Sequence, residues 1–140
     1  MFLLDTNALT DLFKDNTKIL ARLRTIPDDR SVVTSLISRI EILEGRFASI
    51  MKAANRVELL NAAARLAIDE QMLSTIDVLP LSEFVSDEFE RLRTNRKLKK
   101  IGRGDLLIAC FALAHEATLV TRNTRGFEQI PELKIENWAD

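Results

Sequence analysis

The chain has 140 residues, of which 46% are hydrophobic and 29% are charged, and its formal net charge is −1. This length and balance are typical of one globular domain that buries a substantial core. The small net charge excludes a protein held on nucleic acid by bulk charge alone. Any such binding has to come from a local patch of cations.

Several absences narrow the chemistry that the chain can perform. Cys110 is the only cysteine, His115 is the only histidine, and there is no tyrosine. An internal disulfide, a thiolate zinc cluster, an HExxH zinc site and catalysis by a pair of histidines are therefore excluded. Carboxylates without imidazole suit hard divalent cations such as Mg²⁺ or Mn²⁺.

No segment has the features of a membrane span or an export signal. The longest apolar stretch, residues 106–114, is much shorter than the roughly 20 residues that a membrane helix needs. Asp5 interrupts the beginning of any signal peptide. We therefore expect a cytoplasmic protein that does not enter a membrane.

Strands and helices alternate in the first half of the chain. Residues 2–4 are an unbroken apolar run, which is typical of a strand buried on both faces. The elements expected here are, in chain order, a strand at 2–4, helices at 7–15 and 17–24, a strand at 31–35, a helix that begins at Ser38, and a long amphipathic helix at 53–76. Gly45 is expected to bend or weaken the helix that begins at Ser38.

The same alternation continues in the second half. The elements expected are, in chain order, a strand at 78–82, a helix at 83–97, a basic loop at 97–104, a helix at 105–116, a strand at 117–121, an irregular connection at 122–133 and an edge strand at 134–137. The helix at 105–116 is apolar on nearly every face and is therefore expected to be buried. The whole pattern predicts one α/β domain over residues 1–140, with a mainly parallel sheet of four to five strands flanked by helices.

Three carboxylates occupy comparable positions in this pattern. Asp5 follows the first strand, Glu41 lies in the first turn of the helix after the second strand, and Asp105 begins the helix before the fourth. The carboxyl ends of parallel strands share one edge, and a crossover helix that runs antiparallel to the sheet begins at that edge. We therefore expect the three acids to meet in one solvent-reachable pocket. Carboxylates held together repel one another unless a cation neutralises them, and a divalent ion can activate water and polarise a phosphoryl oxygen.

Each acid also has a purely structural interpretation. Asp5 could cap the first helix, and Asp105 could offset the positive end of its helix dipole. Ser38 and Glu41 fit the S-x-x-E capping box. Caps do not explain why all three acids fall at the edge where open sheets bind ligands. Neutral side chains that could orient water or phosphate there, or serve only in turns and caps, are Thr6, Asn7, Thr121 and Asn123.

The motifs LLDTN, SRIEILEG, GRGDLLIACFALAHEATLVTRNTRGF and the closing IENW resemble the PIN domain family. The likeness is closest to its VapC-type ribonucleases of bacterial toxin–antitoxin pairs, and it covers the whole chain in order. The resemblance implies a parallel sheet sandwiched by helices and Mg²⁺- or Mn²⁺-dependent cleavage of RNA. It matches the family's acidic site to Asp5, Glu41 and Asp105. It further implies a small antitoxin partner and a homodimer.

The chain departs from the family's pattern at a fourth acid. Asn123 stands where many relatives carry an aspartate, and Gly126 occupies a nearby place that is often acidic. Three carboxylates suffice for a single Mg²⁺ that keeps several waters, so an active enzyme is the leading hypothesis. A catalytically silent PIN-like module that binds RNA or a partner is the alternative. A phosphatase of the haloacid dehalogenase type would need a second carboxylate two residues after Asp5, where Asn7 stands.

A run of cations at residues 91–103 ends two positions before Asp105. Cations at a helix end explain residues 93–97 well, because they favour the carboxyl end of the helix dipole. The same dipole effect explains the cations of residues 99–103 less well, because these lie beyond the expected helix end. Lys99, Lys100 and Arg103 are therefore expected to contact RNA phosphates beside the acidic site, which fixes position without reading sequence.

Overall fold

A five-stranded parallel sheet lies at the centre of the computed structural model, which describes residues 1–140. The strands are β1 (Phe2–Leu4), β2 (Val32–Ser35), β3 (Asp77–Leu79), β4 (Thr118–Val120) and β5 (Lys134–Glu136). Their order across the sheet is β3-β2-β1-β4-β5, and every neighbouring pair is parallel. The predicted α/β fold with a parallel sheet is confirmed, with five strands and with β5 at an edge.

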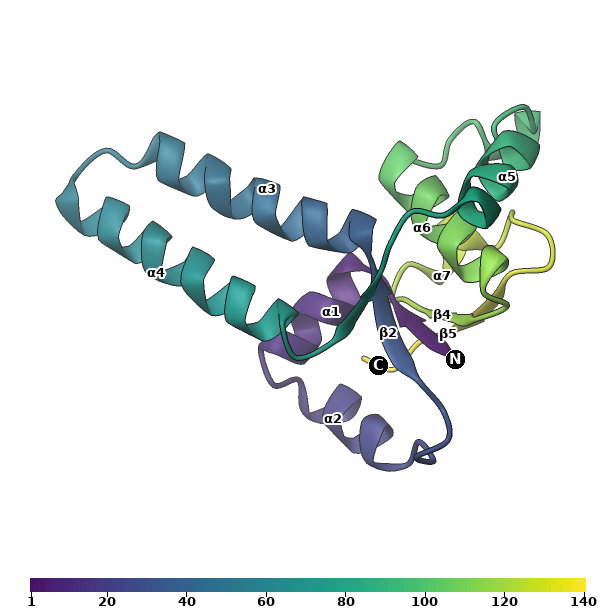
Figure 1. Cartoon of the computed structure of the whole chain (residues 1–140), viewed down its shortest axis with the longest axis horizontal. Helices are drawn as coiled ribbons and strands as arrows, with labels where there is room; N and C mark the ends of the chain where they lie inside the picture. The colour runs from purple at the N-terminus through teal and green to yellow at the C-terminus, as the bar shows by residue number, and fades with distance from the viewer.

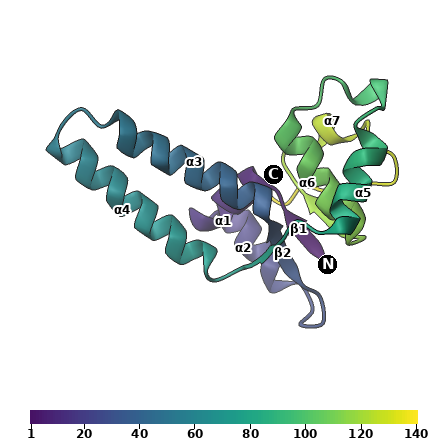
Figure 2. The same cartoon turned by 45° about the horizontal axis from the view of Figure 1, so that its top comes forward.

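The connecting helices lie in two groups on either side of the sheet. They are α1 (Thr6–Phe13), α2 (Thr17–Arg24), α3 (Leu36–Lys52), α4 (Arg56–Leu73), α5 (Glu83–Leu92), the 3₁₀ helix η1 (Arg96–Leu98), α6 (Arg103–Ala114) and α7 (Thr124–Phe127). Figure 1 shows α3 and α4 as an antiparallel hairpin that projects away from the sheet, with α5, α6 and α7 on the opposite side. Figure 2 shows the same projection from a second direction. None of the helices combines the length and the apolar character that crossing a membrane requires.

The two faces of β1 bury alternate side chains in two separate cores. Leu3 packs in one cluster with Phe111 of α6, whereas Leu4 packs in the other with Leu9 of α1 and with Trp138. A strand's side chains point to opposite faces in turn, so a strand covered on both faces has to be apolar throughout. This is the physical reason for the unbroken apolar run at the start of the chain.

The helix that carries Glu41 begins earlier than the sequence predicts. Ser35, the last residue of β2, caps α3 by accepting a hydrogen bond from the Ser38 N–H at 3.2 Å. The predicted capping box of Ser38 and Glu41 is therefore wrong, and Glu41 lies in the second turn of α3. A serine at a strand end can satisfy the first helical N–H groups as soon as the strand stops. The helix continues through Gly45 to Lys52, so the expected interruption at Gly45 is not found.

Asparagine caps explain two further differences from the predicted bounds. The helix expected at 83–97 ends at Leu92, and Asn95 then begins η1 by accepting a hydrogen bond from the Lys97 N–H at 3.0 Å. The connection expected to be irregular contains α7, which Asn123 caps. Short asparagine side chains bond their own backbone in turns, which favours such brief helical segments over a continuous helix.

Candidate functional site

The polar edge of the sheet lies at the carboxyl ends of β1 and β4. Asp5 follows β1 and caps α1, because its Oδ1 accepts a hydrogen bond from the Ala8 N–H at 2.8 Å. Thr121 follows β4, the neighbour of β1 on the side away from β2. The chain first builds the sheet outward through β2 and β3 and later returns to the other side of β1. Such a change of direction leaves a crevice at the carboxyl edge, where open α/β sheets bind ligands.

The three predicted acids act on one another electrostatically at this edge. Asp5 is 4% exposed, and burial raises its pKa above the ordinary value. Hydrogen bonds from Thr121 and Ala8 lower the pKa of Asp5, while the charges of Asp105 and Glu41 raise it. Burial also raises the pKa of Asp105, and the charge of Glu41 raises it further. The sheet topology thus brings the three carboxylates within range of mutual repulsion.

Glu41 lies between the beginnings of α1 and α6. Thr6 Oγ1 donates a hydrogen bond to Glu41 Oε1 at 2.7 Å, and Ser38 Oγ lies 3.0 Å from the same Thr6 oxygen. A Cβ atom built on Gly104 would lie 3.0 Å from Glu41 Oε2, which is closer than ordinary packing allows. The missing side chain of Gly104 therefore leaves the space in which the Glu41 carboxylate approaches the start of α6.

The acids fit a hard divalent cation in chemistry, but their spacing is wider than expected. Oxygen ligands that repel one another are the set that such a cation would neutralise. However, no three His, Cys, Asp or Glu residues are arranged to hold a metal ion together. The reason lies partly in Glu41, whose carboxylate is bonded to Thr6.

None of the larger hollows of the surface is lined by all three acids, so the expectation that they meet in one pocket stays a prediction. Glu41 lines a hollow of about 470 Å³ between α1, α3 and α4, the α1–α3–α4 hollow. Asp105 lines a separate hollow of about 430 Å³ between η1, the start of α6 and α7, the α6–α7 hollow. Asp5 lines neither. Each hollow is therefore lined by one of the two acids that are not fully buried, the exposed Glu41 and the half-buried Asp105.

Besides Thr6, the neutral side chains expected at this edge have different surroundings. Thr121 is buried, and its hydroxyl accepts a hydrogen bond from the Asn123 N–H at 2.9 Å. Asn123 Oδ1 accepts a hydrogen bond from the Gly126 N–H at 3.2 Å, so this oxygen is already engaged as a cap. Asn7 is exposed and makes no side-chain hydrogen bond. Asn123 is consequently a poor replacement for the missing fourth acid.

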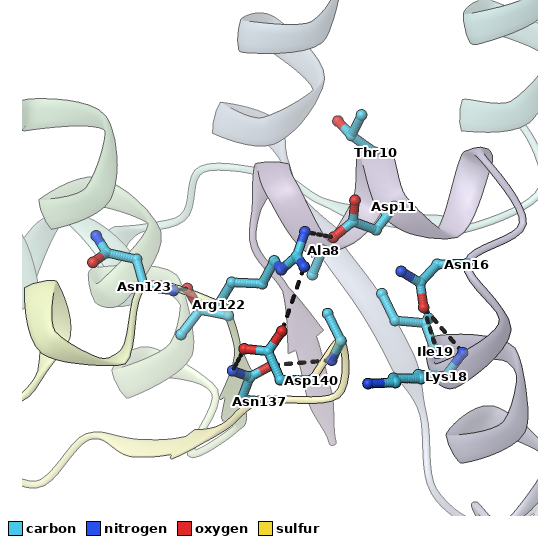
Figure 3. A network of polar contacts seen from close by, with 12 residues as sticks. Ala8, Thr10, Asp11, Asn16, Lys18, Ile19, Arg122, Asn123, Asn137 and Asp140 are labelled. Carbon is cyan, nitrogen blue, oxygen red and sulfur yellow. Dashed lines mark hydrogen bonds and ion pairs between the residues drawn. The ribbon is translucent and has the colours of Figure 1, made fainter.

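Arg122, which sequence reasoning did not single out, fastens α1 to the segment after β4. Its Nη1 lies 3.3 Å from Asp11 Oδ2, and its Nη2 lies 3.4 Å from Asp140 Oδ1, as Figure 3 shows. Asp11 is 111 positions away along the chain, so no local pattern pairs the two residues. These exposed contacts join the surface of α1 to the segment after β4, whereas Asp5 is tied to β4 by its own backbone, whose N–H donates to the Val120 carbonyl at 3.0 Å.

The three cations expected to contact RNA differ in their places. Lys100 lines the α6–α7 hollow, whereas Lys99 is exposed and does not. The Arg103 guanidinium lies over the ring of Phe89, 5.0 Å from its centroid, so it packs on α5. Two further cations line the same hollow as Lys100, and the sequence analysis did not choose them: Lys97 and Arg125.

Comparison with known proteins gives consistent results over the full length. The PIN domain family model matches residues 2–133. Ribonuclease VapC2 of Rickettsia felis is 32% identical over 147 residues, which cover 99% of this chain and 98% of the relative. Among solved structures, VapBC-1 from nontypeable Haemophilus influenzae matches with a TM-score of 0.78 and 27% identity, over 99% of this chain and 98% of that one.

A second solved structure resembles the chain nearly as completely. The toxin–antitoxin complex from Klebsiella pneumoniae matches with a TM-score of 0.67 and 26% identity, over 95% of each chain. Because the family model spans nearly all residues and relatives of similar length match end to end, this chain belongs to the PIN domain family.

Proposed function

We propose that the chain is a metal-dependent endoribonuclease that cleaves RNA phosphodiester bonds and acts as the toxin of a toxin–antitoxin pair. The relative from Rickettsia felis is named a ribonuclease, and the similar Klebsiella pneumoniae structure is a toxin–antitoxin complex. The observation that carries the proposal is the placement of Asp5 at the carboxyl end of β1, where the sheet changes direction, with Glu41 close to the start of the helix that bears Asp105.

Asp5, Glu41 and Asp105 are the residues that would hold Mg²⁺ or Mn²⁺. When bound, the ion supplies neutralisation of the phosphodiester charge and activation of water for attack. The Ala8 N–H orients the Asp5 carboxylate from the start of α1. Because the acids are too widely spaced to bind together as they stand, at least one carboxylate has to move. Glu41 has the longest side chain of the three and is exposed, so it is the one that would turn, in exchange for its hydrogen bond from Thr6.

The cations that precede α6 would contact phosphates next to the cleaved bond. Lys100 has the strongest support, because it lines the hollow that also contains Asp105. Lys99 and Arg103 remain candidates on the basis of the sequence. Contacts of this kind set the position of the strand and leave its sequence unread.

The projecting hairpin supports the proposed partners, an antitoxin and a second copy of the chain. Seven of its large apolar side chains are exposed, among them Phe47 at 50% and Met51 at 84%; the others are Ile40, Val57, Leu59, Leu60 and Ile68. Exposed apolar surface of this extent on a small domain is typical of an interaction site. The charged backbone of an RNA would not bury this apolar surface, whereas an apolar protein surface would.

A cleavage assay with paired variants tests the proposed enzyme. The purified protein is incubated with total RNA and Mg²⁺ or Mn²⁺, beside Asp5→Asn and Asp105→Asn. We expect cleavage that requires the metal and falls below detection in both variants. Asp11→Asn is the matched control, since Asp11 also belongs to α1 but its carboxylate pairs with Arg122 instead of acting on the other two acids. Circular dichroism checks that all variants fold.

The spacing of the acids favours one alternative function, a silent PIN-like module that binds RNA or a partner. No three acids are arranged for a metal ion, and the Asn123 oxygen is engaged as a cap. The same assay separates the two functions. Absence of cleavage by the unmodified protein, with RNA retained equally by the variants, would establish the binding module and reject the enzyme.

A further inference from the structure

Six of the nine residues that line the α6–α7 hollow have polar or charged side chains, and two more are glycines. Ile101 is its only hydrophobic residue. Its cations come from two parts of the chain that α6 and β4 separate in sequence and the fold brings together: Lys97 and Lys100 from η1 and the loop after it, and Arg125 from α7. The one carboxylate in the lining is Asp105. The hollow therefore carries an excess of positive charge beside the acidic edge.

None of these three cations is neutralised by an ion pair. Arg91 and Arg93, earlier in the same basic run, pair with glutamates of α5 at 2.6 and 2.8 Å. Lys97, Lys100 and Arg125 have no carboxylate within 4.0 Å. Cations left unpaired around a common hollow repel one another, and an anion placed between them removes that repulsion.

The neutral groups of the hollow also favour a ligand rich in hydrogen-bond acceptors. Asn123 uses its oxygen to accept the Gly126 N–H, which leaves its Nδ2 as a donor. A Cβ atom at Gly126 would lie 2.3 Å from that Nδ2, so a side chain at this position would displace the Asn123 amide. The glycine thus keeps the donor in place at the rim of the hollow.

We propose that the α6–α7 hollow binds a backbone phosphate of single-stranded RNA on one side of the cleaved bond, through Lys97, Lys100 and Arg125. The identity of the strand as RNA rests on the proposed function. The volume of about 430 Å³ is in the range of pockets for small ligands, about 300–1,000 Å³, so one nucleotide of a flexible strand fits. Because Asp105 forms a wall of the hollow, a strand seated there passes directly over the acidic edge.

An antitoxin fits this hollow less well than a nucleic acid does. Seven of the nine exposed large apolar side chains belong to the α3–α4 hairpin, which lies on the other side of the sheet (Figure 1); the other two, Leu81 and Phe84, do not line the hollow. The hollow has a single apolar residue, so apolar anchors of a partner protein would find little surface to cover.

The test measures binding of a fluorescein-labelled single-stranded RNA by anisotropy, over a series of salt concentrations and in EDTA. Asp5→Asn is present in every sample, so that cleavage does not interfere. Lys100→Ala/Arg125→Ala is compared with Arg24→Ala/Lys134→Ala, which removes the same two charges from exposed residues outside the hollow and without ion pairs. Thermal melting checks that both variants fold.

We expect the hollow variant to reduce the slope of log K against log salt by about 1.4, since each phosphate contact to a single strand contributes about 0.7. The control is expected to leave the slope nearly unchanged. An equal slope in the two variants would overturn the assignment, as would unchanged RNA binding together with loss of a co-purifying protein.

The binding data, taken together with the cleavage assay on the unmodified protein, separate this inference from the proposed enzyme. If the unmodified protein shows no metal-dependent cleavage but the slope falls as expected, the enzyme is rejected and the phosphate site stands. If cleavage requires metal while the hollow variant binds RNA as the control does, the enzyme stands and the phosphate site is rejected.

Discussion

The helices on the two sides of the sheet bury their apolar residues to very different extents. In α6, the five consecutive residues from Ile108 to Ala112 are all buried. In α4, a helix of 18 residues, the only buried ones are Ala62, Asp69 and Leu73. Composition accounts for only part of this difference, because α4 is also rich in apolar residues and leaves Val57, Leu60 and Ile68 exposed.

The difference comes from what surrounds each helix. The α6 helix lies between the sheet and α5, whereas α4 packs mainly against α3, away from the sheet (Figure 1). An enclosed helix makes a rigid support for Asp105, which lies in its first turn. A helix with one neighbour keeps an apolar face available for another chain. The half of the molecule that contains α6 therefore supports Asp105 rigidly. The α3–α4 hairpin has an apolar face that another chain can bind.

The first prediction compares one phenylalanine from each half. Phe111→Ala is expected to lower the free energy of unfolding by about 3–5 kcal/mol, because it leaves a cavity in a closed core. Phe47→Ala on the exposed face of the hairpin is expected to change it by about 0.5 kcal/mol or less. Urea unfolding of both variants measures the two values. Equal losses would show that the isolated hairpin is packed as tightly as the core.

The second prediction concerns the ion pair between Arg46 of α3 and Asp69 of α4, the one ion pair that joins the hairpin's two helices. Asp69→Asn is expected to cost about 1–2 kcal/mol, between the values for exposed and buried pairs, since the pair is only partly buried. Glu90→Gln, which breaks the exposed pair with Arg93 inside α5, is the control and should cost much less. A larger loss in the control would reject this ranking.

The third prediction tests the one close approach between the two halves, that of Glu41 on α3 to Gly104 on α6. Gly104→Ala is expected to weaken Mn²⁺ binding roughly 10-fold, as displacement of a supporting contact commonly does, while the fold persists. Gly102→Ala is the matched control, because a Cβ atom there meets nothing within 4 Å. Calorimetric titration with Mn²⁺ measures both. Equal affinities would show that the Glu41 carboxylate needs no space at position 104.

The fourth and smallest effect is the pH dependence of stability at the border of the two halves. Burial, and then the charges of Asp105 and Glu41, keep the pKa of Asp5 above its ordinary value of 3.8 despite two hydrogen bonds. A raised pKa in the folded state means that protonation favours folding. The stabilisation is present at low pH and is lost as the pH rises through the folded-state pKa.

Asp5→Asn removes that charge and can keep the cap of α1, so in metal-free buffer it should raise the melting temperature at neutral pH. The gain should shrink as the pH falls through the folded-state pKa. Melting curves over a pH series measure it. A variant that is less stable than the unmodified protein at pH 7 would contradict the sign.

Some parts of this arrangement can be predicted from the sequence because they follow from local patterns and sheet topology. The apolar run ending at Asp5 marks a central strand, and the position of Asp105 at the start of a buried helix places it near the same edge. The cap of α3 was assigned to Ser38 in place of Ser35, since both serines fit a helix start and only the end of β2 decides between them.

Other parts depend on contacts between distant segments, which no local pattern contains. Arg125 meets Lys97 at one hollow because α7 folds back beside η1. Arg103 belongs to the same basic run as Lys100, yet its guanidinium lies on Phe89. The direction in which each side chain leaves the backbone decides whether it faces the hollow. The charge of the residue does not reveal that direction.

Calorimetric titration of the metal-free protein with Mn²⁺ tests most directly whether Asp5, Glu41 and Asp105 hold one cation together. The account predicts one ion per chain, with binding lost in Asp5→Asn and Asp105→Asn, weakened in Glu41→Gln and unchanged in Asp11→Asn. Absence of binding by the unmodified protein, or affinities that do not differ among the three acid variants and the control, would contradict it.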